Sequence, residues 1–319
     1  MLDWLADLKN GLARITGAVA PSAGVGVFGK HPGWDDHLDD IGLHSDALIA
    51  AKQLVYVRGI GGVVDAGQWD ADGEAADVLP AFRHLFFWSD SRSLVVGRLW
   101  SSSDGKGRTK YPMIACVHLE GRTEPGIPDI APLLEELEVQ CKSATTADEV
   151  RGILAKEAVR CPGLLAASAV VSPARKDYLA QLGFDMGSDS AVRIAYSVAS
   201  YFAPLAQSAL LKSAIHLRLA ESNVQPQHLR FPAVSGFPTA AFQFWREFLA
   251  GVLPGSVPQL FIVPLDAPWV DVIVGLPTPK HLACLKIGPK QMPLCSEIPY
   301  TIEGEHRAAA EAAWRAFLA

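Results

Sequence analysis

Residues 84–119 read HLFFWSDSRSLVVGRLWSSSDGKGRTKYPMIACVHL, and this stretch decides the fold. It contains three apolar runs rich in aromatic and β-branched residues, at 84–88, 94–100 and 113–119. A short polar segment separates the first two runs, and a longer polar loop, 101–110, separates the last two. Runs of this composition with such connections are typical of strands joined as hairpins. The stretch therefore predicts three consecutive strands in an antiparallel meander.

Further strands and helices are expected on both sides of this meander. Short apolar or alternating runs indicate strands at 25–29, 215–219, 260–263 and 270–274. Apolar residues at helical spacing indicate a helix from Ser45 that the glycine-rich stretch 59–67 ends, and further helices at 174–182, 190–202, 239–250 and 305–318. The chain turns helical from about residue 128, and Thr146 and Glu149 have the spacing of a capping box. Strands at both ends with helices between them favour an α/β fold, with one mixed sheet covered by helices on both faces.

The first residues are expected to form an appendage to this domain. Four apolar residues recur at helical spacing in residues 1–16, namely Leu5, Leu8, Leu12 and Ile15. The polar face of this helix is not basic, so packing on its own domain is favoured over a membrane or partner contact. We therefore expect an amphipathic helix and linker over residues 1–24 and one α/β domain over residues 25–319.

Composition narrows the class of protein. Half of the 319 residues are hydrophobic, 19% are charged and the net charge is −6, which suits a folded domain and not a disordered chain. Basic residues cluster only weakly, within loop 101–110, so no nucleic-acid binding is expected. No apolar run approaches the length of a membrane-spanning helix, so no membrane span is expected. We also expect no signal peptide, because Asp3, Asp7 and Lys9 interrupt the N-terminal apolar run.

The five cysteines are widely spaced and include no C-x-x-C pair. This pattern predicts free, mostly buried thiols in a reducing compartment, and not a disulfide or zinc framework. The chain is therefore expected to be cytoplasmic.

The segment His31 to Asp40 concentrates histidines and aspartates. Imidazole and carboxylate groups together suit zinc, manganese or iron, so His31, Asp35, Asp36 and His37 are candidate ligands of a metal-dependent hydrolase. Their spacing is not that of one helix face, and a solvated loop whose aspartates cap backbone N–H groups is favoured. A partner-contact loop is a third interpretation.

Other catalytic patterns are missing from the sequence. It contains no nucleophile elbow, no P-loop and no H-E-x-x-H motif. The glycines of 24–29 satisfy G-x-G-x-x-G only as a string, because they fall inside the expected strand. Loop 101–110 has two interpretations: it holds an anion through backbone N–H groups and Arg108, or it is a hairpin connection with a structural Asp–Arg pair.

Residues 29–37 (GKHPGWDDH) and 97–108 (GRLWSSSDGKGR) form two blocks that together resemble the TagF/ImpM family of type VI secretion proteins. The segment 29–37, GKHPGWDDH, is similar to the family's G-K-x-P-x-x-G-D-F signature, with Asp35 in place of the glycine and His37 in place of the phenylalanine. The segment 97–108 is similar to its G-x-L-x-P-S-x-D-x-x-G-R block, with Ser101 in place of the proline, and an aromatic–proline pair follows. The matching positions taken as partner-surface candidates are Gly29, Lys30, Pro32, Asp36, Ser102, Asp104, Gly107, Arg108 and Pro112.

The resemblance implies a three-layer α/β sandwich without known catalytic activity and without a cofactor. It implies a bacterial accessory protein that regulates type VI secretion after translation, through contacts with secretion components and a forkhead-associated scaffold protein. A metal-dependent hydrolase and a purely structural subunit are the alternatives. We further expect Asp36 and Asp104 to form a buried structural pair with Arg108 that connects the two loops.

Overall fold

The structure is a computed structural model that describes residues 22–69, 79–89, 93–120, 130–164, 174–185, 187–205, 226–253 and 257–319. The N-terminal helix expected over 1–16 and the strand expected over 215–219 lie outside these residues. Of the expected helix and linker, only residues 22–24 are described, and they belong to the first strand and not to a linker.

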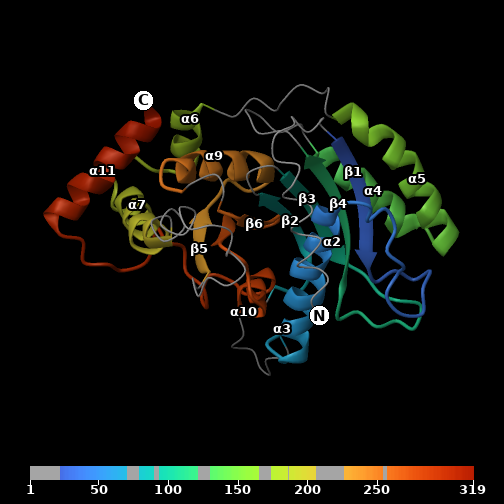
Figure 1. Cartoon of the computed structure of the whole chain (residues 1–319). Coiled ribbons are helices and arrows are strands. Elements are labelled where there is room, and N and C mark those ends of the chain that lie inside the picture. Colours follow the sequence, from blue (N-terminus) through green and yellow to red (C-terminus); the bar gives the residue numbers. More distant parts are fainter. Residues whose placement is uncertain are drawn as a thin grey trace, which may run out of the picture.

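A seven-stranded sheet forms the centre of the molecule (Figure 1). Its order is β1-β4-β3-β2-β6-β7-β5, and each of these neighbours pairs antiparallel. The strands are β1 (Ser22–Gly29), β2 (Arg83–Ser89), β3 (Ser93–Ser101), β4 (Pro112–Glu120), β5 (Gln227–Pro232), β6 (Gln259–Pro264) and β7 (Trp269–Val274). The predicted meander of β2, β3 and β4 is confirmed.

The mixed sheet expected from the sequence is wrong for the described strands. The helical segment after β4 does not return the chain beside β4 in the same direction, as a parallel pair would require. It carries the chain to the far edge at β5, and β6 then enters antiparallel beside β2. Strand β5 was not predicted at all.

The helices are α2 (Asp46–Ala51), the π-helix η1 (Lys52–Ile60), α3 (Gly61–Asp65), α4 (Ala131–Ser143), α5 (Ala147–Leu164), α6 (Arg175–Gln181), α7 (Asp189–Tyr201), α9 (Pro238–Ala250), α10 (Pro279–Leu282), the 3₁₀-helix η3 (Ala283–Leu285) and α11 (Gly304–Leu318). The predicted helices at 174–182, 190–202, 239–250 and 305–318 are confirmed. Two predicted caps are also present: Ser45 accepts a hydrogen bond from the Leu48 N–H, and Thr146 and Glu149 accept from each other's N–H.

The glycines after residue 58 do not end the first helix, contrary to the prediction. The helix runs on through η1 and α3 to Asp65. A Cβ on Gly59 would lie 2.8 Å from the Leu282 side chain, and one on Gly62 would lie 2.8 Å from Pro279. The glycines therefore allow α10 to pack closely against this helix and do not act as breakers.

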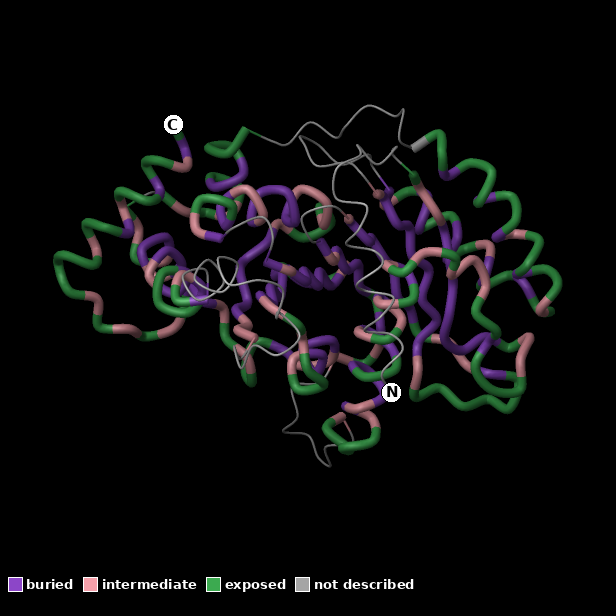
Figure 2. The backbone as a smooth tube through the Cα atoms, in the orientation of Figure 1, coloured by how far each residue is buried: buried purple, intermediate pink, exposed green. Residues whose placement is uncertain are grey.

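The core consists of two clusters made from alternating strand residues, as the period of a strand requires. One cluster contains Phe87, Val96 and Ala115 together with residues of α4, α5, α7, α9 and α11. The other contains Phe86, Val95 and Ile114 together with residues of α2, η1, α3 and α10. The buried stretches follow the strands in Figure 2. The five cysteines are free and buried, as predicted.

One described helix, Asp46–Asp65, is long and apolar enough to cross a membrane by length and composition alone. From the sequence we expected no apolar segment of membrane-spanning length. About half of this helix packs inward, since Leu48, Val55 and Ile60 belong to the second core cluster. A core helix passes the same test, so the finding is weak support for a membrane span.

Replacing Gly97 by alanine tests the packing at the centre of the meander. Gly97 pairs with Phe86, and a Cβ would lie 2.1 Å from a ring carbon of that buried side chain. We expect Gly97→Ala to lower the free energy of unfolding by about 1–3 kcal/mol, because the ring has to move. Chemical denaturation followed by circular dichroism measures it.

Gly152→Ala on α5 is the matched control. A Cβ there meets nothing within 4 Å, and alanine favours a helix over glycine by up to about 1 kcal/mol, so this variant is expected to gain stability. A Gly97→Ala protein as stable as the wild type would contradict the packing argument.

Candidate functional site

The first motif and the aromatic–proline pair meet directly. The Lys30 N–H donates to the Pro112 carbonyl at 3.1 Å, and the Leu38 N–H donates to the Gly29 carbonyl at 2.9 Å. Gly29 has φ of 116°, and a Cβ at this position would lie 2.3 Å from the Pro112 oxygen. Only glycine fits here, because both the backbone angle and the close approach exclude a side chain.

The second loop wraps around the carboxylate of Asp104. The Asp104 Oδ1 accepts hydrogen bonds from the N–H groups of Lys106 and Arg108, each at 3.0 Å. The Gly107 N–H donates to the Asp104 carbonyl at 2.9 Å, and Gly107 has φ of 77°, which favours glycine in this turn. The backbone donors that were candidates for an external anion are thus occupied by an internal carboxylate.

Four charged side chains connect the two loops, and we call Lys30, Asp36, Asp104 and Arg108 the loop-bridging cluster. The Lys30 ammonium lies 2.9 Å from Asp104 Oδ2 and 2.5 Å from Asp36 Oδ1. The Arg108 guanidinium lies 2.7 Å from Asp104 Oδ2 and 3.0 Å from Asp36 Oδ1. The pairing expected from the sequence is present, with Lys30 as an additional member. The expected burial is confirmed for Asp104 and is wrong for Asp36 and Arg108, whose side chains are more than half exposed.

The cluster is buried on one side and open on the other. The side chains of Lys30 and Asp104 are 4% and 0% exposed, whereas those of Asp36 and Arg108 are 65% and 53% exposed. Burial alone would raise the pKa of Asp104, but hydrogen bonds from Lys30 and Arg108 outweigh it and lower that pKa. The hydrogen bond from Lys30 also lowers the pKa of Asp36. Both carboxylates are therefore ionised at neutral pH.

The remaining motif residues line the same two loops. Pro32 is exposed, and Ser102 is half-buried two residues before Asp104. The Gly105 N–H donates to the Trp34 carbonyl at 2.7 Å, which adds a backbone contact between the loops. The structure thus brings residues that are some seventy positions apart into one region.

The four residues of the alternative metal site do not converge. His31 is buried, its Nε2 donates to the Cys141 carbonyl at 2.9 Å, and its Nδ1 accepts from the Gly33 N–H at 3.0 Å. The His37 Nδ1 lies 2.7 Å from the Tyr56 hydroxyl, and the Asp35 side chain is 83% exposed. Among the described residues, the groups close enough to share an ion lie elsewhere in the chain.

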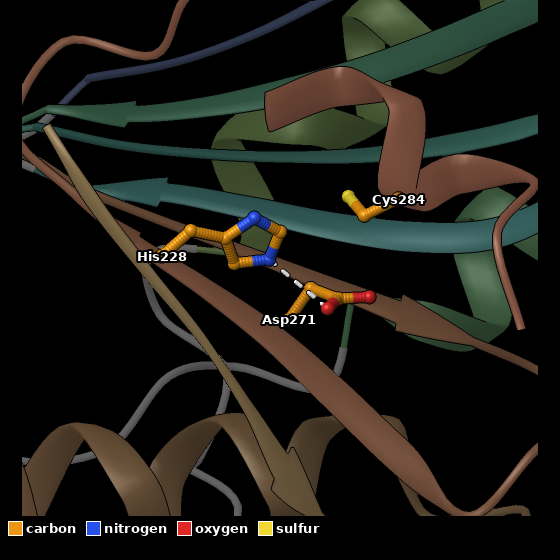
Figure 3. A group of neighbouring side chains, drawn as sticks. All are labelled: His228, Asp271 and Cys284. Atoms are coloured by element: carbon orange, nitrogen blue, oxygen red, sulfur yellow. Dashed lines mark hydrogen bonds and ion pairs between the residues drawn. The ribbon is translucent and has the colours of Figure 1, made fainter. Parts of the chain in front are cut away.

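One of these groups, drawn in Figure 3, lies at the β7–β5 end of the sheet, with Asp271 and Cys284 buried and His228 partly buried. His228 on β5, Asp271 on β7 and Cys284 on η3 each offer a ligand atom, and the three atoms lie within 4.8 Å of one another. The His228 Nε2 lies 3.0 Å from Asp271 Oδ1. Exposed residues at the start of α11, Glu303, Glu305 and His306, form the other group.

Arg230 organises the surroundings of the buried group. Its guanidinium donates to both oxygens of Asp271 at 2.9 Å, and also to the carbonyls of Ile287 at 2.8 Å and Met292 at 3.2 Å. Burial would raise the pKa of Asp271, but the charge of Arg230 and the hydrogen bond with His228 lower it. The side chain of Arg230 is 0% exposed, so this ion pair is fully buried.

Sequence reasoning missed this group because its residues come from distant segments. Two signals were available: His228 and Arg230 alternate with Leu229 and Phe231, and Asp271 interrupts an otherwise apolar strand. An alternating run predicts a half-buried strand, and a carboxylate inside an apolar strand predicts a paired charge.

No protein-family model and no curated protein matches this chain. The resemblance to TagF/ImpM therefore depends on the two motif blocks and remains a prediction.

The pH dependence of stability tests the electrostatics of Asp104. Its pKa in the folded protein lies below the ordinary value of 3.8, so its contribution to stability is present above that value and is lost as pH falls through the folded pKa. We expect the wild-type urea midpoint to fall between pH 5 and about pH 3, and to fall less steeply in Asp104→Asn.

The control for this measurement is Asp35→Asn, an exposed carboxylate in the first loop. Its carboxylate is 83% exposed and lies 4.0 Å from Lys106, so we expect the pH dependence of the wild type. Equal slopes for Asp104→Asn and the wild type would show that Asp104 is not held in its charged form by the fold.

Proposed function

We propose that this chain is a non-enzymatic accessory protein of a bacterial type VI secretion system, related to TagF/ImpM. In this proposal it regulates secretion after translation through contacts with secretion components, with a forkhead-associated scaffold protein as partner. The observation that carries the proposal is the loop-bridging cluster, which joins the two blocks that resemble the family. Their joint occurrence has a physical cause, since Lys30 of the first block needs Asp104 of the second.

The chemistry of the cluster favours a fixed surface over turnover. Two cations and two carboxylates pair with one another at 2.5 to 3.0 Å, so each charge is engaged in holding loop shape. A general acid or base needs a pKa near neutral pH, whereas the carboxylates of Asp36 and Asp104 have lowered pKa values. This supports a binding role for the two loops.

The exposed part of the two loops is the proposed partner surface. It presents Asp35, Asp36, Lys106 and Arg108, with side chains between 53% and 83% exposed. Charges of both signs on a rigid loop favour a partner with complementary charges, because such pairing selects the partner and speeds its association.

The proposal includes a three-layer sandwich and a cytoplasmic location. The two core clusters, which contain alternate strand residues and different helices, support the layers. Five buried free thiols support a reducing compartment. A hydrolase that uses His31, Asp35, Asp36 and His37 is not favoured by the positions of these side chains.

Co-purification from the native host tests this function. The tagged wild-type protein is expected to retain secretion-system components stoichiometrically, and the amount of secreted protein is expected to change with its expression level. Reversing the charges of Asp35 and Lys106, as Asp35→Lys with Lys106→Glu, is expected to reduce that retention at least tenfold. The bond from the Lys106 N–H to Asp104 is a backbone contact and survives this change.

The matched control reverses one acid and one base on α11, as Glu305→Lys with Arg315→Glu. These side chains are 79% and 60% exposed, close to the 83% and 60% of Asp35 and Lys106. We expect it to bind as the wild type does. Repeated absence of secretion components from the wild-type eluate would refute the proposed function. Full binding by the Asp35→Lys, Lys106→Glu variant would show that the two loops are not the partner surface.

A further inference from the structure

The buried group at the end of the sheet has the donor set of a transition-metal site. His228, Asp271 and Cys284 offer an imidazole nitrogen, a carboxylate oxygen and a sulfur from three separate elements (Figure 3). Sulfur and imidazole ligands suit zinc, whereas calcium and magnesium prefer oxygen alone. Although His228 and Asp271 are far apart in the sequence, they lie close together because their strands, β5 and β7, pair with each other.

We propose that His228, Asp271 and Cys284 bind a zinc-like divalent ion, which fastens η3 to the edge of the sheet. In a tetrahedral zinc site the ligand atoms lie about 2.0–2.3 Å from the metal, and hence about 3.5 Å from one another. The three atoms here lie within 4.8 Å, and His228 Nε2 is already 3.0 Å from Asp271 Oδ1. Side-chain movements of about an ångström bring the set to coordination distance.

Arg230 is a positioning residue for this site. It fixes the carboxylate of Asp271 through two hydrogen bonds, as outer partners orient metal-binding carboxylates. It also holds the carbonyls of Ile287 and Met292, in the segment that follows Cys284. The positions of Asp271 and of the segment after Cys284 are therefore fixed by hydrogen bonds that exist without the ion.

The charge of Arg230 also limits the affinity. In the chain alone Arg230 and Asp271 neutralise each other, and Cys284 is a free thiol. Binding M²⁺ through His228 Nε2 moves the proton that this atom donates to Asp271 onto Nδ1. It also releases the Cys284 proton to solvent as the metal–sulfur bond forms, which leaves one net positive charge in the cluster. We expect weaker binding than at a site built from four thiolates.

His281 on α10 lies beside the proposed site, with its ring 6.0 Å from that of His228 between centroids. The His281 Nδ1 already accepts from the Thr278 N–H at 3.1 Å, so we expect a water molecule as the fourth ligand.

Cobalt titration of the reduced, chelator-treated full chain tests the proposal, because Co²⁺ replaces Zn²⁺ and absorbs visibly. We expect one equivalent to produce a sulfur-to-cobalt charge-transfer band and intense visible bands, and Zn²⁺ to abolish both. Cys284→Ala is expected to lose the charge-transfer band. Cys161→Ala, which removes another buried thiol on α5, is expected to keep it.

Two further variants keep the result decisive. His228→Gln is expected to weaken zinc binding at least tenfold in competition with a chelating dye, and serves if Cys284→Ala does not fold. His306→Ala in the exposed group is expected to keep the band, since that group has no sulfur. The proposal is overturned if the wild-type chain shows no charge-transfer band, or if Cys284→Ala retains it.

Discussion

A lysine ammonium removed from water has to be matched by a carboxylate, and the two loops of the loop-bridging cluster depend on this constraint. Lys30 is 4% exposed at the side chain, and Asp104, 0% exposed, lies 2.9 Å from it. An unpaired buried charge is costly, and Asp36, the other partner of Lys30, is 65% exposed, so the buried match between the two loops is that of Lys30 with Asp104. Gly29 allows this approach, since it brings the backbone against Pro112 without a Cβ. The shape of one loop is therefore a consequence of the other.

The same rule operates at the opposite end of the sheet, with a different cation. Arg230 presents a planar fork that bonds both oxygens of Asp271 and also two carbonyls of the segment after η3. A lysine ammonium is a point charge without such geometry, and Lys30 needs only to lie between two carboxylates. An arginine is required at position 230, where the side chain also donates to backbone carbonyls. Arg98 on β3 pairs in the same way with Glu138 on α4, so buried charge pairs recur where helices and loops meet the sheet.

The sequence could predict those features that depend on local pattern. The meander, the caps at Ser45 and Thr146 and the later helices follow from alternation, helical spacing and capping chemistry, all within a few residues. Strand direction could not be predicted, because it depends on where the chain returns after a long helical segment. The glycines near residue 60 were misjudged for the same reason: their use is a contact with α10, more than two hundred positions away. The Asp36, Asp104 and Arg108 pairing was within reach once the two blocks were considered together, but the burial of Lys30 required coordinates.

Burial divides the loop-bridging cluster into two halves with different roles. Lys30 and Asp104 are inaccessible, so a partner cannot contact them and their contribution is to loop shape and stability. Asp36 pairs with Lys30 and Arg108 pairs with Asp104, but both side chains are more than half exposed. Their positions at the surface are therefore fixed by the buried pair. Exposed ion pairs add little stability, so the side chains of Asp36 and Arg108 can exchange contacts at low cost. Under the proposed function, a change in the buried half would alter the fold and partner binding together, whereas a change in the exposed residues around it would alter partner binding alone.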